Sequence, residues 1–133
     1  MAQPVVHFEI VAPDGEKLQK FYAQAFDWKV DADNPHNYGM VAAADDRSIG
    51  GGISAGQGDE SYVTVYIEVD DLQAALDKVK DEGGDVVMEP MEIPGAVTMA
   101  QFKDPAGNLI GLVKGGGGVE QASAGDSEDD ADS

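Results

Sequence analysis

The chain contains no cysteine, which excludes disulfide bonds, a thiol nucleophile and thiolate metal ligands. It also has no apolar run that approaches the roughly 18 residues of a membrane span. Its N-terminus has no basic segment followed by an apolar core, which is the pattern of a secretory signal. These absences predict a cytoplasmic protein without a membrane segment.

Basic residues are scarce, because 8 Lys and Arg stand against 26 Asp and Glu, for a formal net charge of −18. A surface of this sign repels nucleic acid and anionic lipid, so neither is an expected partner. Six acids and no base follow Gly115, which leaves 20 acids and 8 bases, or −12, for the rest. Molar salt shortens the Debye length to about 3 Å and relieves such repulsion. We therefore interpret the chain as a halophilic, salt-adapted protein; an ordinary acidic mesophilic protein is the alternative.

Two segments of the chain repeat at an offset of 57 residues (64 − 7). Residues 7–12 align with residues 64–69, and three apolar positions keep the same offset: Leu18 with Ala75, Tyr22 with Val79, and Val30 with Val87. Each copy contains an alternating strand, an acidic turn, an amphipathic helix and further strands. The repeat predicts an α+β fold of two βαβββ modules, at about residues 5–54 and 61–114, in one domain that spans residues 1–114.

The predicted elements follow from periodicity and turn residues. We expect strands at residues 5–12, 28–33, 38–44, 48–54, 62–69, 85–91, 97–103 and 109–114. Asp14 is expected to cap a first helix, with an apolar stripe of Leu18, Phe21, Tyr22, Ala25 and Phe26. Asp70 or Asp71 is expected to cap a second helix that ends at Gly83. Residues 115–133 form an acidic, Gly-rich tail that is predicted to be disordered.

Alternation along the strands divides their side chains between two faces. One face is apolar and is expected to pack against the helices; it consists of Phe8, Ile10, Val65, Ile67, Phe102, Ile110 and Leu112. The other face mixes polar and aromatic groups, namely His7, Glu9, Thr64, Tyr66, Glu68 and Gln101. A face of this composition favours a cupped, mixed sheet that lines a cavity, with the helices on its outer face.

Several short motifs, taken in their order and spacing, resemble the vicinal oxygen chelate superfamily. They are the strand with His7, Phe26-Asp27-Trp28, Ile49-Gly50-Gly51-Gly52, Val69-Asp70-Asp71-Leu72 and Asp104-Pro105-Ala106-Gly107-Asn108. This superfamily comprises glyoxalase I, bleomycin-resistance proteins and extradiol dioxygenases, and the resemblance covers residues 5–114. It implies a U-shaped sheet around a cup, in which the enzymes hold one divalent metal by His and Glu from both modules.

Compared position by position, the metal-ligand set of the resembled enzymes is incomplete. His7 occupies the first-strand ligand position, but its counterpart is Thr64, and the closing-strand position is Gly111. A catalytic metal site usually needs three protein ligands, so one imidazole should hold a metal poorly. We therefore predict no complete metal centre and no cofactor. The alternative is a divalent Zn, Ni, Fe or Mn ion at His7, completed by Glu9 and Glu68.

The resulting hypothesis is a glyoxalase/bleomycin-resistance-like protein, expected to form a homodimer, that binds a small organic molecule in the cup. His7 and Glu9 are the candidate catalytic bases for proton abstraction next to a carbonyl or for an isomerisation, with His7 exchanging protons near pH 6 to 7. The candidate ligand-binding residues are Thr64, Tyr66, Glu68, Met99, Gln101 and Gly111, and Tyr62 also faces the predicted cup. The alternative functions are a metal-dependent lyase, isomerase or dioxygenase with non-standard ligands, and a non-catalytic sequestering or stress protein.

Overall fold

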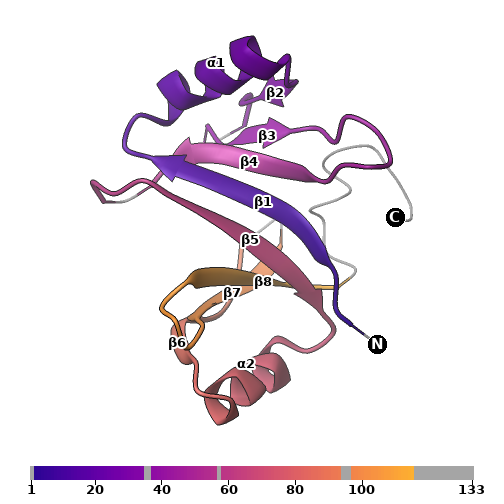
Figure 1. Cartoon of the computed structure of the whole chain (residues 1–133), viewed down its shortest axis with the longest axis vertical. Coiled ribbons are helices and arrows are strands. Elements are labelled where there is room, and N and C mark those ends of the chain that lie inside the picture. The colour runs from indigo at the N-terminus through magenta and orange to yellow at the C-terminus, as the bar shows by residue number, and fades with distance from the viewer. Residues whose placement is uncertain (1, 35–36, 57, 94–96, 116–133) are drawn as a thin grey trace. The chain divides into compact units, whose positions relative to one another are not determined.

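The computed structural model describes residues 2–34, 37–56, 58–93 and 97–115, which form two compact units. The N-terminal module consists of residues 7–63, and the C-terminal module of the described residues 64–115 together with residues 2–6. The elements follow the order βαβββ twice, as the repeat predicted (Figure 1). The predicted disordered tail lies, beyond Gly115, outside the described residues.

The N-terminal module contains β1 (Val5–Ala12), α1 (Gly15–Phe26), β2 (Val30–Asp31), β3 (Gly39–Val41) and β4 (Gly50–Ala55). Its strands lie in the order β2-β3-β4-β1, with β4 and β1 parallel and the other neighbours antiparallel. The strands β2 and β3 are shorter than predicted. Next to β3, the Asn34 side chain binds the backbone of Tyr38 instead, and Asn37 has a φ of 52°.

The C-terminal module contains β5 (Tyr62–Val69, which belongs to this module from Thr64), α2 (Leu72–Asp81), β6 (Asp85–Glu92), β7 (Thr98–Lys103) and β8 (Leu109–Lys114). Its strands lie in the order β5-β8-β7-β6, and β5 and β8 are parallel. The parallel pair therefore joins the first and last strands of this module, as β1 and β4 do in the N-terminal module. The predicted bounds of β5 and β8 agree with the structure.

The hydrophobic core of the C-terminal module lies between α2 and the sheet. Its buried residues are Val69, Leu72, Leu76, Ala100 and Leu112, with Ile67, Ala75, Val86 and Phe102 packed around them. The Asp71 side chain accepts a hydrogen bond from the Ala74 amide and so caps the helix, as one of the two predicted alternatives. The apolar face predicted for these strands is confirmed at Ile67, Phe102 and Leu112.

The apolar stripe predicted for α1 is wrong at three positions. Phe21 and Phe26 are 56% and 60% exposed, and Ala25 is exposed as well. The buried polar residue of this helix is Gln19, whose side-chain amide donates to the carbonyl oxygens of Ile53 at 2.7 Å and Asn37 at 3.1 Å. The helix is therefore rotated so that Gln19 faces the sheet, and Gly39 leaves the space that this amide fills.

Neither helix of the described chain combines the length and the apolar character that crossing a membrane requires.

Candidate functional site

A polar cluster of His7, Glu9 and Tyr38, called the His7 cluster below, lies in the N-terminal module. Alternation along β1 places His7 and Glu9 on the same face of the sheet. The Tyr38 hydroxyl lies 2.8 Å from His7 Nε2 and donates to Glu9 Oε2 at 3.0 Å. The phenol donates its one hydrogen to the Glu9 carboxylate. In the hydrogen bond between His7 and Tyr38, His7 Nε2 is therefore the donor and the phenol oxygen is the acceptor. The three side chains therefore form a chain of hydrogen bonds from imidazole to phenol to carboxylate.

Two features of the chain position Tyr38. The Asn34 side chain accepts from the Tyr38 amide at 2.9 Å and donates to the Tyr38 carbonyl at 2.7 Å, so it binds both backbone groups of this residue. Gly52 lies opposite Glu9 in the neighbouring strand β4, and a Cβ added there would overlap the Tyr38 ring. Because Gly52 has no side chain, the Tyr38 ring can lie against β4 at this position.

His7 is buried, with 6% of its surface exposed, and burial lowers its pKa from 6.5 to about 4. The predicted proton exchange near pH 6 to 7 is therefore wrong, because this imidazole stays neutral there. The sequence pattern predicted a partly buried position for His7, whereas the side chain is almost fully buried. Burial and the negative charge of Glu9 together raise the pKa of Tyr62, which indicates that Tyr62 also lies near the cluster.

Burial of His7 should make folding depend on pH between about 4 and 6.5. In this window the unfolded chain binds a proton at His7 and the folded chain does not, so the free energy of unfolding falls as the pH decreases. The full shift corresponds to about 3 kcal/mol. Denaturation of the wild type and of His7→Gln at constant high salt measures this term by difference, since the two proteins carry the same acidic residues. An identical pH dependence in the two proteins would contradict the buried neutral imidazole.

In the C-terminal module, the structure brings together three of the predicted ligand-binding residues: Tyr66, Gln101 and Gly111. Gly111 pairs with Tyr66 in β5 and with Gln101 in β7. The Tyr66 ring covers Gly111, and Gln101 Nε2 lies 3.5 Å from the Tyr66 hydroxyl. Thr64 is buried, and its hydroxyl donates to the Leu109 carbonyl at 2.6 Å.

Glu68 and Met99, the other predicted ligand-binding residues, are half-buried on β5 and β7. Of the eight predicted site residues, His7 and Glu9 therefore lie in the N-terminal module and the other six in the C-terminal module. Their roles, and the cup that they would share, stay predictions. Tyr38, Asn34 and Gly52 were not predicted as site residues, although the sequence has an Asn four residues before a Tyr and a glycine run downstream of both.

The donor groups of the described residues do not fit the metal centre of the resembled enzymes. Gly52 and Gly111 occupy the same place in β4 and β8, each opposite a side chain of the parallel first strand. The space that a side chain would need at these two positions is filled by the rings of Tyr38 and Tyr66. Throughout the part of the chain that the structure describes, no three His, Cys, Asp or Glu side chains gather into a metal-binding group.

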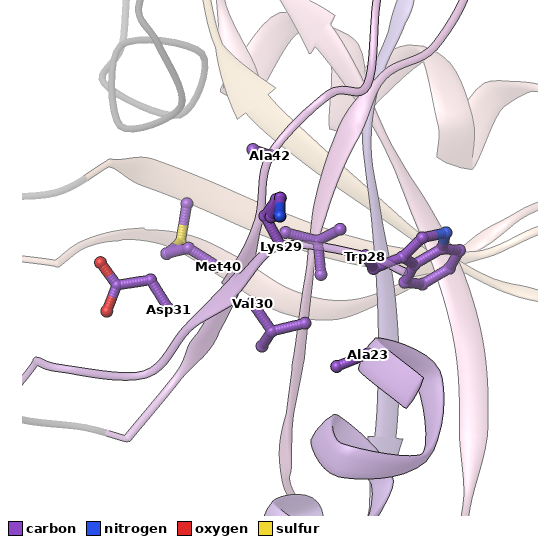
Figure 2. A pocket seen from close by; sticks show the side chains of 8 residues that line it. Ala23, Trp28, Lys29, Val30, Asp31, Met40 and Ala42 are labelled. Carbon is purple, nitrogen blue, oxygen red and sulfur yellow. The ribbon is translucent and has the colours of Figure 1, made fainter. Parts of the chain in front are cut away.

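A hollow of about 500 Å³ lies elsewhere in the N-terminal module, at the sheet edge formed by β2 (Figure 2). It is lined by Ala23, Trp28, Lys29, Val30, Asp31, Met40, Val41 and Ala42. Its volume lies in the range that suits small organic ligands, and its lining is mainly apolar. None of its residues belongs to the His7 cluster, although Met40 pairs with Gly52, the glycine that supports Tyr38.

Comparisons with known proteins agree with this architecture. The family model that describes the glyoxalase/bleomycin resistance protein/dioxygenase superfamily matches residues 5–112. The anthracycline biosynthesis protein DnrV of Streptomyces peucetius is 28% identical over 126 residues, which cover 82% of this chain and 46% of DnrV. The protein CFP32 of Mycobacterium bovis is 33% identical over 116 residues, which cover 78% of this chain and 42% of CFP32. This chain thus spans less than half the length of these relatives.

Among solved structures, the Mn(II)-bound glyoxalase of Novosphingobium aromaticivorans superposes with a TM-score of 0.63 at 18% identity, over 97% of this chain and 42% of that one. A methylmalonyl-CoA epimerase superposes with a TM-score of 0.58 at 18% identity, over 83% of this chain and 93% of that one. At these identities the likeness shows a shared fold.

Proposed function

The chain belongs to the glyoxalase/bleomycin resistance protein/dioxygenase superfamily, and we propose that its His7 cluster binds a small neutral carbonyl compound and moves a proton on it without a resident metal. The observation that carries this proposal is the half-buried carboxylate of Glu9, held by the Tyr38 phenol beside a neutral imidazole. A carboxylate is an acceptor for a proton on carbon next to a carbonyl group.

Glu9 is a better candidate for the base than His7. Glu9 is partly exposed and can be reached by a ligand, whereas only 6% of the His7 surface is exposed. His7 Nε2 is engaged with the Tyr38 hydroxyl, and the low pKa of this imidazole makes its protonated form unfavourable near neutral pH. His7 then acts by holding Tyr38.

The charge of the protein favours a neutral ligand. Glu9 lies in the cluster, and the sequence carries 26 acids against 8 bases, so an anionic ligand would be repelled both at the site and by the surface. The absence of a metal is proposed from the available donor groups. Gly111 occupies the closing-strand ligand position of the resembled enzymes, Gly52 occupies the same place in β4, and tyrosine rings fill the space that a side chain would need there. The hydrogen bond between His7 and Tyr38 further engages the one imidazole of the cluster.

Deuterium exchange into hydroxyacetone in D₂O, followed by proton NMR, tests the proposed function. We expect the wild type to exchange the hydrogens next to the carbonyl faster than buffer alone, and Glu9→Gln to lose a factor of about 10²–10⁴. Glu16→Gln is the matched control, because it removes the same charge from the exposed first turn of α1. Exchange no faster than in buffer, or equal in wild type and Glu9→Gln, would refute proton transfer. A thermal shift with hydroxyacetone but without exchange would indicate a sequestering protein.

Elemental analysis of protein purified without added metal separates this proposal from a metal-dependent lyase, isomerase or dioxygenase. Stoichiometric Zn, Ni, Fe or Mn that is lost in His7→Ala would overturn the proposal that the protein holds no metal.

The homodimer also stays a proposal. It is favoured by the exposed rings of Phe21 and Phe26, which contact Tyr22 and would be buried by a partner, and sedimentation equilibrium would measure it.

A further inference from the structure

We infer that Tyr38 binds the carbonyl oxygen of the ligand and stabilises the negative charge that develops there. This role rests on the proposed function and adds to it a residue that neither the sequence pattern nor the family likeness indicated. Tyr38 is half-buried, and its hydroxyl is positioned by the hydrogen bonds that it makes with His7 and Glu9. The hydroxyl already lies within hydrogen-bond distance of the proposed base, because it donates to Glu9 Oε2 at 3.0 Å.

The phenol has one hydrogen and can donate it to one acceptor at a time. When a carbonyl oxygen takes the place of Glu9 as the acceptor, Tyr38 donates to the ligand and the carboxylate loses this donor. A carboxylate with fewer donors is a stronger base. Binding of the carbonyl group therefore polarises the ligand and prepares Glu9 for proton abstraction in the same rearrangement.

The proton transfer is balanced without any further reactant. Glu9 takes a proton from the carbon next to the carbonyl group, and the electron pair of that C–H bond moves to form a C=C bond. The pair of the C=O bond moves to the oxygen, whose charge Tyr38 stabilises by its hydrogen bond. When Glu9 returns a proton to the same carbon, the pair of the C=C bond forms the new C–H bond and the pair on oxygen restores the C=O bond. In D₂O the proton on Glu9 first exchanges with solvent, so the carbon takes up deuterium.

The residues around Tyr38 hold its hydroxyl group in position to donate a hydrogen bond. Asn34 fixes its backbone through two hydrogen bonds, and Gly52 leaves the space for its ring. The Nε2–H of the neutral His7 donates to the phenol oxygen at 2.8 Å. A donor on the phenol oxygen polarises the O–H group and strengthens the bond that it gives to the ligand. Because His7 is neutral, this arrangement adds no charge that would have to be desolvated.

The test measures kcat and KM for deuterium exchange into hydroxyacetone in Tyr38→Phe and Gly52→Ala. Tyr38→Phe removes only the hydroxyl, and we expect kcat to fall by about 10²–10³-fold, as when one donor to a developing oxyanion is removed. Gly52→Ala keeps the hydroxyl but places a methyl group where the ring lies, so it should lose a comparable factor. The double variant should then be no slower than either single variant, because both remove the same interaction.

Two matched controls accompany these variants. Tyr22→Phe removes a phenol hydroxyl from α1, and Gly58→Ala adds a methyl group where nothing lies within 4 Å. Both should exchange at the wild-type rate. Melting temperatures of all variants show whether they are folded at the assay temperature.

A kcat of Tyr38→Phe within about threefold of the wild type would overturn the inference and leave the proposed function standing, provided that Glu9→Gln still loses a factor of about 10² or more. A purely structural Tyr38 would lower the melting temperature while the folded protein kept its kcat. If the wild type itself does not exchange faster than buffer, the proposed function fails, and the role of Tyr38 falls with it.

Discussion

Transfer of the protein from about 3 M to about 0.1 M KCl is expected to lower its melting temperature by about 10 °C or more. The Debye length rises from about 3 Å to about 10 Å over this range, so acids on neighbouring elements begin to repel one another. The described residues contain three ion pairs, Lys20 with Glu16, Arg47 with Asp45, and Lys80 with Asp77, and all six side chains are largely exposed. Such pairs contribute little, so they do not offset the repulsion. A loss of about 2 kcal/mol corresponds to a shift of about this size.

Salt can stabilise the protein by screening the repulsion between acids or by strengthening the burial of apolar surface, and a variant with fewer acids distinguishes the two effects. Asp81 and Glu82 lie at the C-terminal end of α2, where the helix dipole also disfavours negative charge. The double variant Asp81→Asn/Glu82→Gln should therefore raise the melting temperature more at 0.1 M than at 3 M KCl. Calorimetric scans of both proteins at the two salt concentrations measure this difference. A wild-type melting temperature that is the same at both concentrations would rule out the salt-adapted interpretation.

The two-module architecture could be predicted because each strand and helix is marked by residues within or next to it, namely by apolar periodicity and turn residues. The bounds of β5 and β8 agree with the structure because turn residues mark them: Asp70 follows the alternating strand β5, and the turn from Asp104 to Asn108 precedes β8. The predicted strands at β2 and β3 were too long, and at Tyr38 the reason is visible: its backbone groups bond to the Asn34 side chain. Periodicity cannot reveal such side-chain bonds to the backbone.

The face of α1 and the His7 cluster could not be predicted, because both depend on contacts between distant segments. The helix stripe contained more apolar residues than the sheet covers, and the hydrogen bond of Gln19 to Ile53 decides which edge of the stripe faces inward. Tyr38 meets His7 and Glu9 because a loop residue reaches across Gly52 on another strand. The sequence places His7 and Glu9 on one face, but no spacing rule places a residue 31 positions from His7 beside them.

Replacement of Leu76 by Ala should lower the free energy of unfolding by about 2–5 kcal/mol, which is the range for a large aliphatic side chain removed from a packed core. Leu76 is 0% exposed and lies in the core that α2 forms with the sheet of the C-terminal module. The substitution itself favours helix, since Ala has the highest helix propensity, so any loss reflects the vacated space and the lost apolar burial.

Urea denaturation at about 3 M KCl measures this loss under the condition in which both proteins should be most fully folded. Val87→Ala is the matched control, because Val87 is 49% exposed on β6 and its truncation leaves no enclosed cavity; it should lower the free energy of unfolding by less than about 1 kcal/mol. A loss below about 1 kcal/mol for Leu76→Ala would show that α2 does not pack on the sheet as described. A large loss is expected even at this salt concentration, since salt relieves the repulsion between surface acids and cannot refill the cavity.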